Sequence, residues 1–249
     1  MAGGASPIAL AAALPAELAF VSRLGRFRSE RTGGMECQRG AICGVETALL
    51  VSGMGGGRAY ETAKTACASI RPRAYISVGF SAALIPGLGP GAVVVGESTT
   101  INGGPVYPSD AALLRLAGEA LGRAGGVRFG PLTALPEVAV TADEKKAVAK
   151  ATGCLALDME SFGAARGAGE AGVPFLAVRA ISDALDEDLP VDFNRFVRGG
   201  GMDWPRFLLH VAAHPGAVPG LAGLAMRSRM AARKLARALE RLLSGVRQD

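Results

Sequence analysis

Two neighbouring stretches decide the fold: residues 154–162 read CLALDMESF, and residues 173–183 read VPFLAVRAISD. In each stretch an apolar run ends in acids, and a helix-like segment separates the two runs. This pattern is typical of buried parallel strands joined by a helix. Because open α/β sheets bind ligands beyond the carboxyl ends of their strands, Asp158, Glu160 and Asp183 are predicted to lie at a ligand site.

The same alternation extends over most of the chain. Apolar runs predict further strands at residues 8–14, 47–51, 74–78 and 92–95. Periodic segments predict helices at residues 16–24, 58–70, 111–124, 143–151, 160–171, 204–213 and 221–243. Strands alternating with helices predict an α/β fold with a mostly parallel sheet that is covered by helices on both faces.

The composition is typical of a globular protein without disulfide bonds or a membrane span. With 249 residues, 49% of them hydrophobic, the chain can bury a full core in one globular domain. The four cysteines show no CxxC spacing, which argues against a disulfide framework or a zinc site and favours a reducing compartment. No apolar run is long enough to span a membrane, and the apolar N-terminal segment is interrupted by Pro15 and Glu17. A cytoplasmic location is therefore expected.

The C-terminal segment carries the net charge of +5, because residues 221–249 hold seven Lys or Arg and two acids. Within it, one helical stripe is apolar, and its members are Leu235, Leu239, Leu242, Leu243 and Val246. Residues 221–249 are thus predicted to form a basic amphipathic helix beside a domain of residues 1–220. Two interpretations stay open: the helix packs on the body, or it rests on an anionic membrane surface. Nucleic acid is not expected as a partner, since the body is neutral and aromatic residues are few.

Three acids near strand ends could carry chemistry: Glu17, Glu160 and Asp183. One carboxyl group can protonate a leaving group, another can bind sugar hydroxyls, and a third can activate water, as in glycosidic cleavage. Each acid alone has a plainer explanation, which is helix capping. The glycine-rich loop at residues 53–57 lacks the ending of a P-loop and is equally well explained as a tight turn or as a loop that presents N–H groups to a ligand.

The pattern Asp-Met-Glu, Val-Pro-Phe and Val-Arg-Ala-Ile-Ser-Asp resembles the purine nucleoside phosphorylase and methylthioadenosine/S-adenosylhomocysteine nucleosidase superfamily, from Ile8 to about Phe196. The phrase around Asp183 and the basic tail look most like the hopanoid-associated nucleoside phosphorylase branch. This resemblance implies a mixed, mostly parallel sheet that is partly closed into a barrel. It also implies a homo-oligomer, no metal and no organic cofactor, with phosphate as a possible co-substrate.

The resemblance also implies roles for individual residues. Asp183 matches the acid that protonates the purine at N7, and Glu160 matches the carboxylate that holds the ribose hydroxyls. Glu17 matches the acid that activates water in nucleosidases. The substrate-binding residues implied are Met159, Ser182, Gly79, Phe80 and Ser81. The base pocket is expected near residues 138–140.

Departures from the family pattern help to decide between hydrolysis and phosphorolysis. Ser77 stands where bacterial phosphorylases have a phosphate-binding arginine, which favours hydrolysis. Arg58, Arg28 and Arg31 are alternative phosphate-binding cations that keep phosphorolysis open. A nucleoside-binding protein without turnover is the competing class. The resemblance implies cleavage of a 5′-substituted adenosine, either adenosylhopane in hopanoid biosynthesis or methylthioadenosine in nucleoside salvage. The lipid substrate would place the enzyme at the inner face of the membrane.

Overall fold

A computed structural model describes residues 6–122 and 125–246. Its main sheet runs in the order β10-β6-β8-β9-β5-β1-β4-β3-β2, with β7 on β6, and β11 and β12 form a separate short hairpin. The strands are β1 Ile8–Ala12, β2 Gly25–Thr32, β3 Met35–Ile42, β4 Val45–Val51, β5 Ala74–Ala83, β6 Val93–Ile101, β7 Val106–Pro108, β8 Val127–Ala134, β9 Ala156–Asp158, β10 Phe175–Asp183, β11 Val197–Arg198 and β12 Gly201–Met202. The α-helices are α1 Pro15–Leu18, α2 Gly56–Ser69, α3 Ala111–Leu121, α4 Ala142–Thr152, α5 Ser161–Glu170, α6 Trp204–Ala213 and α7 Val218–Ser244. The 3₁₀ helices are η1 Val21–Arg23, η2 Phe193–Phe196 and η3 Pro215–Ala217.

Strand β10 closes part of this sheet into a barrel. It pairs with β6 on one side and in parallel with β5 on the other, so β10, β6, β8, β9 and β5 form a ring. The strands β4, β1, β5 and β10 are parallel, whereas β2, β3 and β4 form an antiparallel meander at the edge. The predicted α/β fold with a mixed, partly closed sheet is confirmed.

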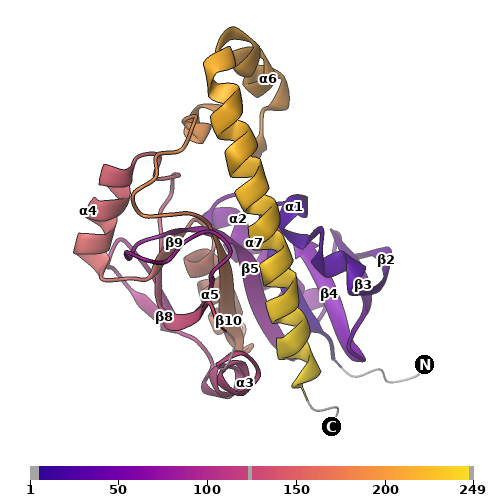
Figure 1. Cartoon of the computed structure of the whole chain (residues 1–249). Coiled ribbons are helices and arrows are strands. Elements are labelled where there is room, and N and C mark those ends of the chain that lie inside the picture. Colours follow the sequence, from indigo (N-terminus) through magenta and orange to yellow (C-terminus); the bar gives the residue numbers. More distant parts are fainter. Residues whose placement is uncertain (1–5, 123–124, 247–249) are drawn as a thin grey trace.

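Both faces of the sheet are buried, which explains the continuous apolar runs of the central strands (Figure 1). In β1, Ile8 and Leu10 face a core shared with α3 and α7, while Ala9 and Ala11 face a core shared with α2 and α5. Small residues bring α2 and α5 close together. A Cβ on Gly163 would lie 2.0 Å from the carbonyl oxygen of Gly56.

The edge hairpin β2–β3 and strand β8 have no counterpart among the predicted strands. Most side chains of β2 are exposed or only partly buried, so the segment lacks the apolar run that marked the central strands. Pro131 lies within β8, and a proline in a sequence argues against a strand. The helix predicted at 16–24 is shorter than expected and divides into α1 and η1. The end of the helix predicted at 111–124 lies outside the described residues.

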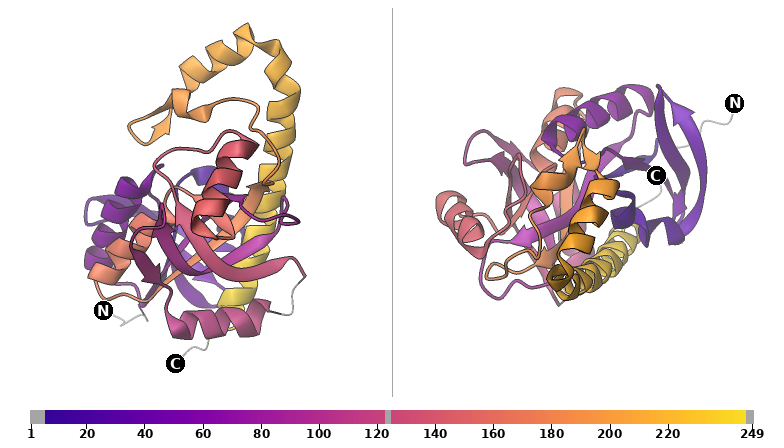
Figure 2. Two further views of the ribbon diagram at one scale, coloured as in Figure 1. Left: turned by 90° about the vertical axis from the view of Figure 1, so that its left-hand side faces the viewer. Right: turned by 90° about the horizontal axis from the view of Figure 1, so that it is seen from above.

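Helix α7 has two halves with different surroundings. Its residues Leu235, Leu239, Leu242 and Leu243 are buried in the core, so the predicted apolar stripe faces the body over this half. The first half lies beyond the body and, with α6, forms a projection at one end of the molecule (Figure 2). We call residues 204–230 the helical arm. Within the described residues no single helix could span a membrane; only α6 taken together with residues 215–244 has the length and composition, and that pair is bent by 102°.

Leu235 and Leu209 give a matched test of this division, because they are 0% and 73% exposed. Leu235→Ala should lower the free energy of unfolding by about 3 kcal/mol, since it removes buried methyl groups and leaves a cavity. Leu209→Ala should change it by less than about 0.5 kcal/mol. Urea denaturation of both variants measures the difference. Equal losses would contradict the assignment of the two halves.

Candidate active site

The three predicted acids meet at one cavity of about 170 Å³ at the carboxyl ends of β1, β9 and β10. Of the residues expected at the site, the cavity is lined by Glu17, Phe80, Met159, Glu160, Ser182 and Asp183. Val138 and Ala139, from the segment expected to form the base pocket, also line it. Asn194 fixes this segment, because its side chain accepts from the backbone N–H of Val138 and donates to the carbonyl oxygen of the same residue, both at 2.9 Å.

Glu17 is held by backbone donors from two directions. One carboxylate oxygen accepts from the N–H of Phe80 at 2.7 Å, and the other accepts from the N–H of Leu14 at 2.8 Å. Gly79 makes room for this arrangement, since a Cβ there would lie 2.6 Å from Oε1 of Glu17. The acid therefore caps its own helix and also lines the cavity. Gly79 and Ser81 do not line the cavity themselves, and the carbonyl oxygen of Ser81 lies 3.3 Å from Ser182 Oγ.

The glycine-rich loop at residues 53–57 donates a backbone N–H to the side chain of Glu160 and not to a ligand. The backbone N–H of Gly55, which precedes α2, donates to Oε1 of Glu160 at 2.8 Å. Gly55 has a φ of 98°, a conformation that residues with a side chain rarely adopt. The loop thus orients Glu160, and Met54 from the same loop lines the cavity.

A buried ion pair lies behind the cavity. Nε of Arg179 pairs with Asp158, and another guanidinium nitrogen donates to Ser77 Oγ at 2.8 Å. The remaining oxygen of Asp158 accepts from the N–H groups of Glu160 and Ser161 at 3.1 and 3.0 Å. Asp158 therefore caps α5 and fixes the backbone of Glu160.

Asp183 also has a basic partner, although no basic residue follows it closely in the sequence. Nζ of Lys145 in α4 donates to Asp183 Oδ2 at 2.8 Å and to the carbonyl oxygen of Ala184 at 2.6 Å. Ser182 Oγ donates to Asp183 Oδ1 at 2.7 Å. The Lys145 side chain is 0% exposed. The sequence analysis missed it, because Lys145 lies in a run of charged residues that is indistinguishable from a solvated helix face.

The three arginines considered as phosphate ligands lie elsewhere. Arg58 packs against the backbone of Gly200, and Arg28 and Arg31 are exposed on the edge hairpin. Among the residues that the structure describes, no Lys or Arg lines the cavity that holds the acids.

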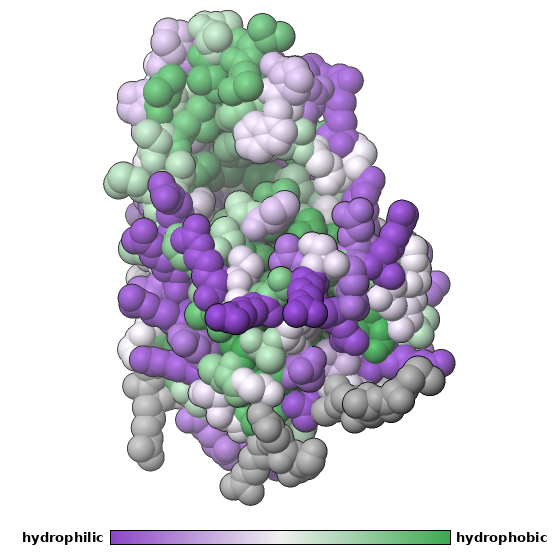
Figure 3. Space-filling view, turned by 90° about the vertical axis from the view of Figure 1, so that its right-hand side faces the viewer, coloured by the Kyte–Doolittle hydropathy of each residue, from purple (hydrophilic) through white to green (hydrophobic). Residues whose placement is uncertain are grey.

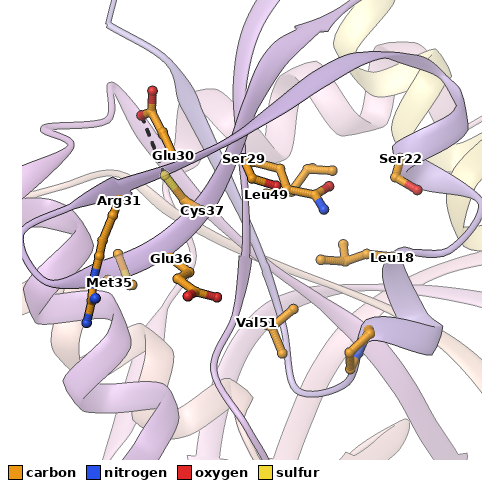
Figure 4. A pocket seen from close by; sticks show the side chains of 12 residues that line it. Leu18, Ser22, Ser29, Glu30, Arg31, Met35, Glu36, Cys37, Leu49 and Val51 are labelled. Carbon is orange, nitrogen blue, oxygen red and sulfur yellow. Dashed lines mark hydrogen bonds between the residues drawn. The ribbon is translucent and has the colours of Figure 1, made fainter.

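A larger cavity of about 600 Å³ lies between α1, η1 and the edge strands (Figure 4). Glu30, Arg31, Glu36 and Cys37 line it, and Cys37 Sγ donates to Glu30 at 3.6 Å. It contains none of the predicted catalytic or substrate-binding residues, and Arg31 is the one candidate phosphate ligand among its lining residues. Size alone therefore does not locate the chemistry, and the convergence of buried acids marks the smaller cavity instead.

Comparison with known proteins agrees with this geometry. Residues 7–200 match the family described as Phosphorylase superfamily. The chain belongs to this superfamily. A relative, the 5′-methylthioadenosine/S-adenosylhomocysteine nucleosidase of Geobacillus kaustophilus, is 28% identical over 214 residues, which cover 76% of this chain and 89% of the relative. The predicted superfamily membership is confirmed, and the chain is an enzyme of the nucleosidase or nucleoside phosphorylase class.

Solved structures of nucleosidases and of a futalosine hydrolase share the fold. The S-adenosylhomocysteine nucleosidase of Streptococcus pyogenes has a TM-score of 0.78 at 19% identity, with 100% of both chains covered. The methylthioadenosine/S-adenosylhomocysteine nucleosidase of Streptococcus pneumoniae, bound to a transition-state inhibitor, has a TM-score of 0.75 at 20% identity, covering 96% of this chain and 99% of that one. The futalosine hydrolase of Helicobacter pylori has a TM-score of 0.76 at 15% identity, covering 97% and 98%.

Burial changes the acidity of two carboxyl groups in this superfamily site. It raises the pKa of Glu160 to about 7, and the negative charges of Asp158 and Glu17 add to the shift. Burial also raises the pKa of Glu17, although the N–H groups of Phe80 and Leu14 oppose the change. Both acids therefore exchange protons closer to neutral pH than an exposed glutamate does.

The raised pKa of Glu160 predicts a stability change with pH. The folded state holds this proton more tightly than the unfolded state, so the stabilisation is present below about pH 4.5 and is lost as the pH rises to about 7. Glu160→Gln should therefore be more stable than the wild type at pH 8, by up to about 3 kcal/mol, and similar to it at pH 5. Thermal unfolding at both pH values measures this, with the exposed Glu46→Gln as control. An equal difference at both pH values would contradict the prediction.

Lys145→Met should lower the free energy of unfolding by about 3–5 kcal/mol, because it leaves the buried Asp183 without its ammonium partner. The matched control is Lys146→Met, which removes an exposed lysine from the same helix. Adding Asp183→Asn to Lys145→Met should restore part of the loss, since the unpaired charge is then gone. Urea denaturation of the three variants gives the comparison. Equal effects of Lys145→Met and Lys146→Met would rule out a structural ion pair.

Proposed function

We propose that this enzyme is a nucleosidase that uses water to cleave the N-glycosidic bond of a 5′-substituted adenosine. The observation that carries the proposal is the cavity itself, which gathers Glu17, Glu160 and Asp183 and has no Lys or Arg among its described lining residues. The names of the relatives, which are nucleosidases for methylthioadenosine and S-adenosylhomocysteine, support an adenosine-type substrate.

The three acids would divide the reaction between them. Asp183, near the 138–140 segment and ion-paired with Lys145 in the free enzyme, would take up a proton when substrate binds and give it to the purine N7 as the bond between the base and C1′ breaks. The carboxyl group of Glu160, oriented by Gly55, would accept hydrogen bonds from the ribose hydroxyls. Glu17 would take a proton from the water whose oxygen bonds to C1′. The products are adenine and a sugar with a free hydroxyl group at C1′.

The charges of the cavity favour hydrolysis over phosphorolysis. A phosphorylase stabilises a multiply charged anion with arginines or fixed N–H donors. Here Arg179 is occupied by Asp158 and Ser77, and the N–H of Gly55 is occupied by Glu160. A phosphate ion entering the cavity would meet carboxylates. Phosphorolysis remains the alternative reaction.

For the 5′ substituent we propose the lipid of adenosylhopane, with methylthioadenosine as the alternative. Ligand pockets commonly measure about 300–1,000 Å³, so a cavity of about 170 Å³ would leave a bulky 5′ group outside it. The sequence assigned membrane contact to residues 221–249, but the buried stripe in the second half of α7 is not available for it. Contact at the inner face of the membrane would therefore fall to the first half of α7.

We also expect a homo-oligomer, and light scattering would measure its molecular mass.

The first experiment compares adenine release from adenosylhopane and from methylthioadenosine, each with and without phosphate. Release without phosphate, with a free sugar product, is expected. A strict requirement for phosphate and a sugar 1-phosphate product would establish the phosphorylase instead. Turnover of methylthioadenosine alone would remove the lipid substrate.

Glu17→Gln should lower kcat by about 10²–10⁴-fold, because the amide cannot accept the proton of water. The exposed Glu119→Gln in α3 is the control and should leave kcat unchanged. The measurement is steady-state adenine release at saturating substrate. If Glu17→Gln keeps full activity, Glu17 is not the base.

A further inference from the structure

The helical arm, residues 204–230, has no interior of its own. No residue in this fully described range is buried, and burial begins in α7 at Ala231. An aromatic cluster attaches α6 to η2, with Phe207 against Phe193 and Phe196. Trp204 also contacts Phe207, and Val211, Leu221 and Leu224 are partly buried. The other large apolar side chains of the arm are exposed.

These exposed apolar side chains gather at one end of the molecule. They are Trp204, Leu208, Leu209, Val218, Met226 and Met230, with exposures from 41% to 73%. Met230, at the base of the arm, also lies against Gly91 of the body. Figure 3 shows hydrophobic residues over the arm and hydrophilic residues over the body below it. Isolated exposed apolar residues are ordinary, but a group of this size on a projecting element indicates a binding surface.

The charge of the arm identifies the kind of partner. Residues 204–230 contain no Asp or Glu and three arginines: Arg206, Arg227 and Arg229. Three more cations follow on α7 before its first acid, Glu240: Arg233, Lys234 and Arg237. Leucines, methionines and a tryptophan flanked by arginines are the composition of helices that lie in the interface of an anionic bilayer. A second copy of this chain fits less well, because two arms facing each other would bring like charges together.

The arm is joined directly to the rim of the cavity. Leu189 lines the cavity, and the next residue, Pro190, packs against Gly220 of α7. Nε of Arg227 in the arm lies 3.7 Å from Oε2 of Glu187, and Glu187 follows Asp183 by four residues. A surface that holds the arm therefore also holds the segment that follows Asp183.

We propose that the helical arm docks this enzyme on an anionic lipid bilayer, with Trp204, Leu208, Leu209 and Met226 entering the interface and the arginines contacting headgroups. The binding surface is thus α6 with the first half of α7, rather than the stripe at residues 235–246. The proposal adds a partner to the proposed function but concerns where the protein binds, not which bond it breaks.

The test mixes full-length protein with vesicles of phosphatidylcholine alone or with phosphatidylglycerol. Trp204 is the only tryptophan in the chain, so its emission reports directly on the arm. Cosedimentation and a blue shift of this emission are expected with the anionic vesicles. Leu209→Asp should weaken binding at least about tenfold, since it places a charge in the apolar layer. Arg229→Glu should weaken it several-fold.

Matched controls lie on α3, at the opposite end of the molecule (Figure 1). Ala112→Asp and Arg115→Glu make the same charge changes at exposed sites and should leave binding unchanged. The proposal is overturned if anionic vesicles do not bind, if the α3 variants lose as much binding, or if Leu209→Asp converts a dimer into a monomer without lipid. Leu209→Asp should keep its activity on water-soluble methylthioadenosine. Vesicle binding by a protein without nucleosidase activity would reject only the proposed function.

Discussion

The buried ion pair between Arg179 and Asp158 is the constraint on which the site depends. Arg179 is 1% exposed at the middle of β10, where an unpaired cation would be strongly destabilising. Its guanidinium group joins β10 to Asp158 at the end of β9 and to Ser77 of β5. The pair thus fixes three strands of the barrel at the level where the cavity begins.

The ion pair also fixes the position of Glu160, through hydrogen bonds between Asp158 and the backbone. The carboxylate that neutralises Arg179 also accepts from the N–H groups at the start of α5, so the position of Glu160 is set by Asp158. Gly55, from the far side of the cavity, then orients the Glu160 side chain. The result is a set of acids held close together with little solvent, which raises the pKa of Glu160 and of Glu17. Acids whose pKa is raised toward neutral pH can both accept and donate protons there.

The cavity that holds the acids and the exposed apolar surface lie in different parts of the molecule. The second half of α7 completes a core that also contains β1, β5 and β10. The first half and α6 contribute nothing buried, yet they carry the largest exposed apolar side chains and an unbalanced positive charge. One continuous helix therefore connects the barrel to an exposed apolar surface.

The sequence by itself determined the α/β class, the central strands, the superfamily and the three acids of the cavity. It could do so because strands buried on both faces need continuous apolar runs, and because acids at their ends follow those runs directly. Only the tertiary structure decided which basic residues neutralise the acids, since Lys145 and Asp183 are 38 residues apart in the chain and meet through the packing of α4. The tertiary structure also decided which half of the basic helix is exposed. An amphipathic stripe has the same pattern whether it faces a protein core or a bilayer, and only the neighbouring elements distinguish the two.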